Sequence, residues 1–266
     1  MASEKATFAP NPRLNALFDS LLDTLRTFIR ENHVTHDEYR RAVAFLSEVG
    51  QKGEVSLLCD VAVEVTVDEV ENNGRPGTIT TIEGPYYVPR APLLKSPCAL
   101  PHRADEPGDL VLFSGTVRSS TGRSLPEAVL DLWQSDANGR YSHFNIPEAV
   151  APYNLRGRVT TNHEGRFEIE TRIPGPYEIP KSGPTGALLA AMARHAWRPA
   201  HLHVKVQHPG YRTLTTQLFL KNDPWLESDV VEGAVKESLI VDPVREQGRY
   251  VLSYDFALEP DATKAA

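Results

Sequence analysis

The run R-P-A-H-L-H at Arg198–His203, continued by V-K-V-Q, places two histidines one residue apart at the start of a predicted strand. Residues two apart on a strand point to the same face, so His201 and His203 project together, as chelation of one metal ion requires. The opposite face is apolar and carries Leu202, Val204 and Val206. Two solvated imidazoles on the wet side of a sheet would give the same short pattern. The motif alone leaves a metal site and an ordinary surface as open alternatives.

Two tyrosines occupy irregular segments that precede these histidines. The turn at 138–140 brings Tyr141 to the end of the run AVLDLW, and the proline-bracketed connection GPYEIP at 175–180 carries Tyr177. Rigid, irregular connections of this kind are often functional. Each tyrosine taken alone also fits a packing residue with a hydrogen-bonded hydroxyl. Spacing does not identify phenolate ligands, so their role stays open at this level.

Composition and charge narrow the class of protein. The chain has 266 residues, 41% of them hydrophobic and 24% charged, with a net charge of -7. This charge argues against a nucleic-acid partner, which usually meets a basic patch. No apolar run approaches the ~18 residues needed to enter and span a bilayer, and no secretory signal is visible. Cys59 and Cys98 are too few for a disulfide framework, so we expect reduced thiols in a cytoplasmic protein.

The first 75 residues have helical periodicity. Apolar residues recur at intervals of three and four in one stripe: Leu14, Leu17, Phe18, Leu21, Leu22, Leu25 and Phe28. Thr35 and Glu38 resemble a capping box that opens a second helix, which stops at Gly50. A third helix is predicted from about Glu54 to Glu71.

After Pro76–Gly77 the pattern changes to short alternating runs separated by turn clusters. Predicted strands lie at 110–118, 128–133, 157–161, 166–172, 201–207, 213–220 and 249–258. Several short strands at this spacing indicate an antiparallel sandwich or barrel, of which we favour the sandwich. We therefore predict a mainly β protein, in which an antiparallel β-sandwich catalytic domain at 76–266 follows an α-helical region at 1–75.

Four stretches together resemble the intradiol ring-cleaving dioxygenases, in the branch of the catechol and chlorocatechol 1,2-dioxygenases. The resemblance is carried by TIEGPYY at 81–87, by the spaced run from Leu112 through Gly115, Gly122, Val129, Asp131 and Gly139 to Tyr141, by PYEIP at 176–180, and by RPAHLH at 198–203 with GYR at 210–212 and TTQ at 215–217. It covers nearly the whole chain, including the predicted helices. The long run that ends on Tyr141 is far more specific than the histidine pair.

The resemblance implies one Fe(III) per subunit, bound by Tyr141, Tyr177, His201 and His203. Phenolates are hard anionic donors that suit a ferric ion, and imidazole is acceptable to iron. The implied reaction inserts both atoms of O2 into catechol, or into a substituted or chlorinated catechol, and yields a cis,cis-muconate. In that reaction Tyr177 is also the base that leaves the metal on protonation.

Two further residues are implied to act around the metal. Arg198 would stabilise negative charge developing on the substrate ring, because its guanidinium is charged at all relevant pH values. Gln217 would orient a histidine or the ring. The alternatives are a structural salt bridge for Arg198 and a surface amide for Gln217.

The resemblance also implies a substrate pocket lined by the third helix and the Gly-Pro loop. Its implied members are Leu57, Asp60, Val61, Ile82, Gly84, Pro85 and Tyr86, together with Arg198, and the segment around Val230–Val231 would close the far side. Ordinary core packing is an equal alternative for Leu57, Val61 and Ile82. Asp60 is unusual in an apolar helix, since a buried carboxylate is costly unless it is bonded.

Three other functions stay open. One methylene or chlorine changes binding by only about 1–3 kcal/mol, so a hydroxyquinol 1,2-dioxygenase of the same family is an alternative. A zinc hydrolase would need a third ligand, for which His195 and His208 are candidates. A metal-free β-sandwich binding module is the third. The apolar stripe suits a helix–helix interface, and relatives dimerise through this region, so we expect a homodimer; packing against the β part is the alternative.

Overall fold

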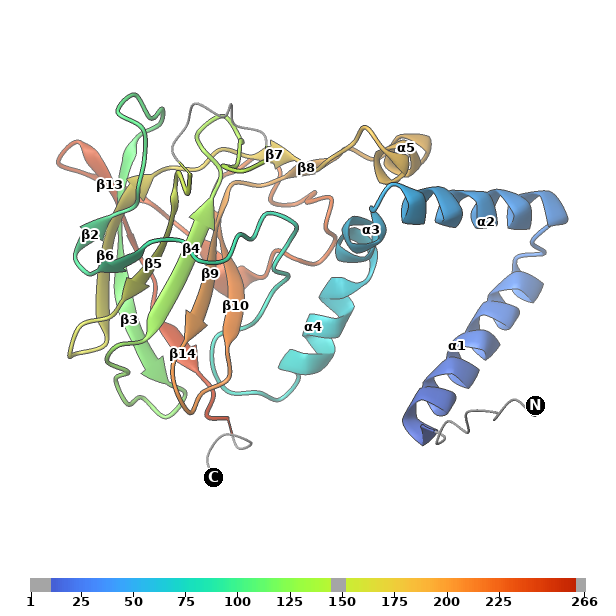
Figure 1. Cartoon of the computed structure of the whole chain (residues 1–266), viewed down its shortest axis with the longest axis horizontal. Helices are drawn as coiled ribbons and strands as arrows, with labels where there is room; N and C mark the ends of the chain where they lie inside the picture. The colour runs from blue at the N-terminus through green and yellow to red at the C-terminus, as the bar shows by residue number, and fades with distance from the viewer. Residues whose placement is uncertain (1–10, 145–151, 262–266) are drawn as a thin grey trace, which may run out of the picture. The chain divides into compact units, whose positions relative to one another are not determined.

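The computed structural model describes residues 11–144 and 152–261 (Figure 1). The chain divides into two compact units, Met1–Gln51 and Lys52–Ala266. Within the described ranges the first unit contains two helices, and the second contains all the strands. No helix in these ranges is both long and apolar enough to cross a membrane. The sequence predicts a boundary at 75/76, where the pattern changes from helices to strands. That boundary is a different one from the division after Gln51, and it stays a prediction.

The first unit consists of α1 (Pro12–Glu31) and α2 (His36–Gln51). The Asn11 side chain caps α1 by accepting from the Leu14 amide at 3.0 Å, with a proline in the first turn. Thr35 and Glu38 form the predicted capping box, in which each side chain accepts from the other's amide. The second helix therefore begins where its capping box predicts.

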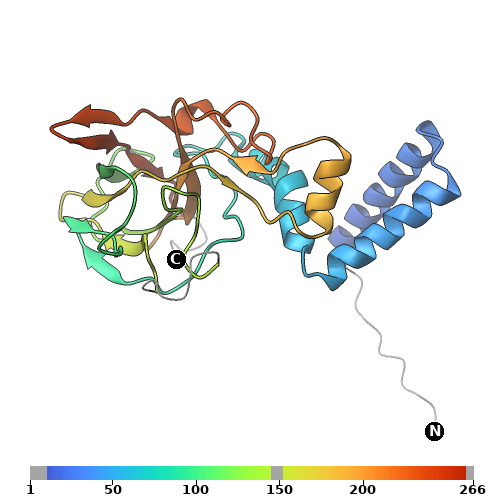
Figure 2. The same cartoon turned by 90° about the horizontal axis from the view of Figure 1, so that it is seen from above.

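The predicted third helix is wrong as a single element. It is interrupted at Val63 (φ -140°, ψ -19°), so that α3 (Val55–Ala62) and α4 (Glu64–Asn72) are separate. Val61, Val63, Val65, Thr66 and Val67 are β-branched, which restricts their side chains in a helix and lowers helix propensity at this point. A further helix, α5 (Pro184–Ala191), was not expected. Its Thr185 amide donates to Glu54 at 2.9 Å, which ties it to the start of α3 (Figure 2).

The strands form two six-stranded sheets and a small pair. The first sheet has the order β1 (Leu93–Lys95), β5 (Arg156–Thr160), β4 (Val129–Gln134), β9 (His201–Gln207), β10 (Leu214–Leu220), β11 (Ile240–Val241). The second has β12 (Val244–Glu246), β13 (Arg249–Ser253), β3 (Leu110–Ser119), β6 (Arg166–Arg172) and β2 (Cys98–Ala99), with β14 (Phe256–Leu258) also paired to β3. The pair consists of β7 (Tyr177–Glu178) and β8 (Trp197–Arg198), and a short 3-10 helix, η1 (Glu237–Leu239), precedes β11.

The mainly β fold is as expected, with antiparallel pairing at the centre of the sheets. The pairs β4–β5, β4–β9, β9–β10 and β3–β6 are antiparallel, whereas β1–β5, β10–β11, β2–β6, β13–β3 and β14–β3 are parallel. The run predicted as one strand at 249–258 divides into β13 and β14. One apolar core contains side chains of both sheets, among them Phe113, Phe167 and Phe256 from the second and Leu130, Leu202 and Leu218 from the first.

The first half of strand β9 is buried on both of its faces, whereas Lys205 is half-buried and Gln207 is exposed. His201, Leu202, His203, Val204 and Val206 are all inaccessible to solvent. The apolar face packs in the sandwich core, as its alternation predicts. At His201 and His203 the other face is buried as well, which overturns the solvated alternative for these two residues.

Candidate metal centre

The two histidines of β9 direct one ring nitrogen each toward a common point. Their Nε2 atoms lie 3.0 Å apart, and each residue is 1% exposed. The Nδ1 of His201 lies 2.7 Å from the Pro199 carbonyl oxygen, which only accepts, so Nδ1 carries the hydrogen and Nε2 keeps its lone pair. Burial lowers the pKa of both imidazoles well below the usual value, and the Arg198 charge adds to the effect. Both rings are therefore neutral, the form that binds metals.

The His203 ring is fixed by stacking on an aromatic side chain of the neighbouring strand. Trp133 of β4 stacks on His203 with ring centroids 4.6 Å apart and an angle of 9° between the planes. Trp133 is opposite His203 in the β4–β9 ladder, so the pairing of the strands places the two rings together. Nothing in the spacing of the sequence singles out Trp133 for this role.

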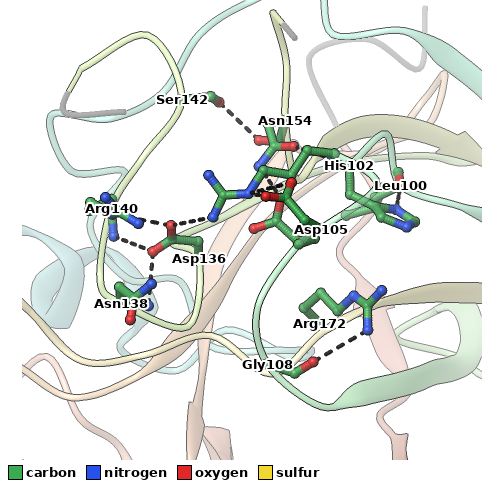
Figure 3. A network of polar contacts seen from close by, with 12 residues as sticks. Leu100, His102, Asp105, Gly108, Asp136, Asn138, Arg140, Ser142, Asn154 and Arg172 are labelled. Carbon is green, nitrogen blue, oxygen red and sulfur yellow. Dashed lines mark hydrogen bonds and ion pairs between the residues drawn. The ribbon is translucent and has the colours of Figure 1, made fainter. Parts of the chain in front are cut away.

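Tyr141 is positioned by a turn built on Asp136. One Asp136 carboxylate oxygen accepts from the amides of Asn138 and Arg140, each at 2.9 Å, and the other lies 3.3 Å from the Arg140 Nε (Figure 3). Gly139 adopts φ +75°, and a Cβ there would lie 2.3 Å from the Pro176 carbonyl oxygen. Glycine is therefore required for this turn to approach the segment that carries Tyr177.

The four predicted ligands form a closed ring of neighbours. Ring centroids are 5.1 Å apart for Tyr141–Tyr177, 5.5 Å for Tyr177–His201, 4.5 Å for His201–His203 and 6.2 Å for His203–Tyr141. None of the four is more than 3% exposed. They come from the turn after β4, from β7 and from β9, so the topology assembles them from segments up to 62 residues apart.

This donor set fits a metal ion. The two Nε2 atoms lie 3.0 Å apart, a separation at which both imidazoles could bind one ion. Burial raises the pKa of Tyr141 and of Tyr177 above the ordinary value. Two buried phenols become phenolates only beside a compensating cation, which a trivalent ion would supply. Two phenolate oxygens with two imidazoles suit ferric iron.

The zinc-hydrolase alternative lacks a third ligand in the described ranges. Within them, no group of three or more His, Cys, Asp or Glu side chains is arranged to hold a metal ion. His195 accepts from the Trp197 amide and lies against Trp225. His208 lies against Tyr211. Neither candidate completes a site with the β9 histidines.

Arg198 is held between two buried side chains beside Tyr177. Its Nη2 lies 2.9 Å from Asp229 and donates at 2.9 Å to the Gln217 Oε1. The Gln217 Nε2 in turn donates to the Ile82 carbonyl oxygen at 2.8 Å. Burial opposes the charge of Arg198, but Asp229 and Tyr177 outweigh it and raise the Arg198 pKa. The salt bridge that was left open is therefore present, and Gln217 is not a surface amide.

Asp229 is a residue that the sequence does not reveal. It lies in an irregular segment 31 positions after Arg198, and its side chain is 3% exposed. The next two residues, Val230 and Val231, are buried, and the Val230 amide donates to the Trp197 carbonyl oxygen. The segment expected to close the far side thus also supplies the carboxylate that pairs with Arg198.

A second buried guanidinium, that of Arg156, lies beside Tyr141. Arg156, at the start of β5, is 1% exposed, and its guanidinium carbon lies 5.8 Å from the centroid of the Tyr141 ring. Burial lowers the Arg156 pKa to about 10, so the group stays charged at neutral pH. No periodic pattern distinguishes Arg156 from the other arginines of the β part.

The expected pocket residues differ in how closely they approach the four ligands. Tyr86 stacks on Tyr141 with centroids 4.5 Å apart, and a Cβ at Gly84 would lie 3.6 Å from the His203 ring. Leu57 and Ile82 are buried members of the apolar core, and Val61 packs against it. Pro85 is exposed. Asp60 is half-buried. Burial raises the pKa of its carboxyl group, and the Arg198 charge opposes this effect.

Asp60, near the end of α3, belongs to a carboxylate pair with Glu64, the first residue of α4. Burial raises the pKa of Glu64 to about 7, and its hydrogen bond with Asp60 adds to the effect. The folded protein therefore holds this proton more tightly than the unfolded chain does. Between pH 4.5 and about 7, this group lowers the free energy of unfolding as the pH rises.

The Glu64→Gln variant is expected to lose that part of the pH dependence. Its thermal unfolding midpoint should exceed that of the wild type at about pH 8 and approach it at about pH 4.5. Glu48→Gln, which removes an exposed carboxylate of α2, is the matched control. Parallel pH profiles for Glu64→Gln and the wild type would contradict the assignment.

Comparison with known proteins gives the same family over both parts of the chain. The family model "Catechol dioxygenase N terminus" matches residues 11–78, and the model "Dioxygenase" matches 82–260. Chlorocatechol 1,2-dioxygenase of Rhodococcus opacus is 43% identical over 233 residues, which are 87% of this chain and 90% of that protein.

Comparison with solved structures indicates the same family. The crystal structure of 3-chlorocatechol 1,2-dioxygenase from Rhodococcus opacus has a TM-score of 0.86 at 40% identity and covers 94% of this chain and 99% of its own. That of hydroxyquinol 1,2-dioxygenase from Pseudomonas putida has a TM-score of 0.86 at 37% identity and covers 95% of this chain and 94% of its own. The chain therefore belongs to the intradiol ring-cleaving dioxygenases, in the branch of the catechol and chlorocatechol 1,2-dioxygenases.

Proposed function

We propose that this chain binds one Fe(III) through Tyr141, Tyr177, His201 and His203 and cleaves catechol, or a substituted or chlorinated catechol, between its two hydroxyl-bearing carbons. The product would be a cis,cis-muconate that contains both atoms of O2. The observation that carries this proposal is the closed ring of two buried phenols and two neutral imidazoles. When bound, the ferric ion would supply the Lewis acidity that activates the diol toward oxygen.

The protein's own residues would then bind the diol and move its protons. Tyr177 is the proposed base, whose Oη takes a proton from a substrate hydroxyl. Its place beside Arg198 supports this role, because the guanidinium charge lowers the pKa of the Tyr177 phenol against the effect of burial. Arg198 would also stabilise negative charge on the ring, with Asp229 and Gln217 fixing its guanidinium.

We propose that Leu57, Val61, Ile82 and Tyr86 give the substrate pocket an apolar lining that suits an uncharged ring. Leu57, Val61 and Ile82 lie in or against the core, and Tyr86 packs on Tyr141. Since the proteins compared above act on chlorocatechol and hydroxyquinol, we place catechol and chlorocatechols first and hydroxyquinol second. Carboxylated diols should be poor substrates, because Asp60 and Glu64 add negative charge on the helical side.

The substrate is tested by a product assay on the iron-loaded protein. Catechol, 3- and 4-chlorocatechol, methylcatechols and hydroxyquinol are compared by kcat/KM and by the absorption of the product. We expect the highest kcat/KM for catechol or a chlorocatechol, with a muconate that absorbs in the ultraviolet. Preference for hydroxyquinol would support the alternative, and a yellow semialdehyde would contradict intradiol cleavage.

We also propose that the chain forms a homodimer through its N-terminal helices. The stripe on α1 is solvent-exposed within this chain: Leu14, Leu17, Phe18, Leu21, Leu25 and Phe28 are between 47% and 60% exposed. Tyr39, Val43 and Leu46 of α2 are exposed as well. An apolar face of this extent is what a second copy would cover.

Sedimentation equilibrium at micromolar concentration should give the mass of two 29.5 kDa chains. The Leu21→Glu variant places a charge in the stripe and should shift the mass toward one chain. Thr27→Glu, on another face of α1, is the matched control. A wild-type mass of one chain would contradict the dimer.

A further inference from the structure

Arg156 makes three hydrogen bonds, all of them to uncharged oxygens. Its Nε donates to the Ser142 Oγ at 2.7 Å, its Nη1 to the Tyr86 carbonyl oxygen at 2.7 Å and its Nη2 to the Ser142 carbonyl oxygen at 3.0 Å. In the described part of the chain, no carboxylate lies within ion-pair distance of it. Arg198, by contrast, is equally buried and is paired with Asp229.

The three acceptors lie on two backbone segments that flank one ring. Ser142 directly follows Tyr141, and Tyr86 stacks on Tyr141 with an angle of 22° between the rings. The fork of Arg156 therefore joins the turn that carries Tyr141 to the loop that covers it. Ser142 is held further by its hydroxyl, which donates to the Asn154 carbonyl oxygen at 2.9 Å (Figure 3).

A buried cation needs a negative charge nearby, or its desolvation is costly. Burial lowers the Arg156 pKa, and the ionisable groups of Tyr141 and Asp131 are the main ones that oppose this effect. Asp131 accepts a hydrogen bond from the Tyr87 hydroxyl and faces Arg158 across the β4–β5 ladder. As a metal ligand, Tyr141 would be a phenolate, and the centroid of its ring lies 5.8 Å from the guanidinium carbon.

We infer that Arg156 is a positioning residue for Tyr141 and tunes its bond to the metal. The forked hydrogen bonds fix the ring of Tyr141 against Tyr86, and the guanidinium charge stabilises the electrons of the phenolate. This inference rests on the proposed function, because it needs a metal bound to Tyr141. The visible absorption band arises when light moves an electron from the phenolate ring to the metal. The electron then lies farther from the guanidinium and is stabilised less by it. Arg156 should therefore raise the energy of this band.

The test compares iron-loaded wild type with Arg156→Gln, Arg156→Lys and the matched control Arg158→Gln. Arg158 lies on the same face of β5, two residues on, and donates to the Ala91 carbonyl oxygen rather than to the Tyr141 turn. We expect the band of Arg156→Gln to move to longer wavelength by roughly 10–30 nm, the effect of one charge lost near the ring. Arg156→Lys keeps the charge and should stay near the wild-type wavelength, with a broader ferric electron paramagnetic resonance signal. Arg158→Gln should match the wild type.

An unchanged band in folded, iron-loaded Arg156→Gln would overturn the inference, as would an equal shift in Arg158→Gln. Circular dichroism and a cooperative thermal transition of each metal-free protein establish folding. If Arg156→Gln does not fold, Arg156→Lys decides the matter, since a shift of the full 10–30 nm there would contradict the role of charge. A colourless, iron-replete wild type would instead contradict the proposed function itself.

Discussion

The Tyr177→Phe variant is expected to lose about 10²–10⁴-fold in kcat, the range for removal of a positioned base. The change removes one oxygen from the ring of ligands and leaves the packing against Tyr141 and His201. The visible band of the iron-loaded protein should weaken at the same time, because one of two phenolate donors is lost. Stopped-flow turnover of catechol and the absorption spectrum measure the two effects.

Tyr211→Phe is the matched control for this result. It removes another largely buried phenol hydroxyl, which accepts from Arg123 in a distant part of the β unit. Turnover and colour should both stay at wild-type values in this variant. If Tyr177→Phe kept wild-type turnover and colour, Tyr177 would be neither a ligand nor the base.

The Arg198→Met variant is expected to lose both stability and activity. Removal of the guanidinium leaves Asp229 as an unpaired, buried carboxylate, which should cost about 3–5 kcal/mol in the free energy of unfolding. The loss of a fixed positive charge beside the ring should lower kcat by about 10²–10³-fold. Urea unfolding and steady-state kinetics on the same preparation measure the two losses.

A double variant separates these two losses. Arg198→Met with Asp229→Leu removes both charges, so much of the lost stability should return while the activity stays low. Recovery of activity together with stability would mean that Arg198 acts only through the fold. Wild-type activity in the single variant would exclude it from the reaction.

For the histidine strand, the local sequence pattern predicts which side chains share a face but not whether that face is buried. Alternation correctly predicts that His201 and His203 share one face of β9, since strand geometry fixes it. Alternation does not reveal that this face is buried. Its burial depends on residues remote in the chain, such as Gln217, which holds the loop at Ile82, and Gly84, which lies against the His203 ring.

The tyrosines and the buried charges show where local pattern ends. Tyr141 and Tyr177 stand in irregular segments, where no periodicity assigns a direction to a side chain, so only resemblance to a family singled them out. Arg156 and Asp229 read as surface charges in the sequence. Their burial follows from contacts across 70 and 31 positions, between Arg156 and Tyr86 and between Asp229 and Arg198. The break between α3 and α4 was missed because apolar periodicity continues through Val63.

The central claim is that two tyrosines and two histidines form a ferric centre for intradiol cleavage. Mass spectrometry of the product that the iron-loaded protein forms from catechol under ¹⁸O2 tests it most directly. We predict a cis,cis-muconate that carries two heavy oxygen atoms, one in each carboxylate, and we predict none from His203→Ala loaded in the same way. A ring-opened semialdehyde, a product with oxygen from water alone, or undiminished turnover by His203→Ala would contradict the account.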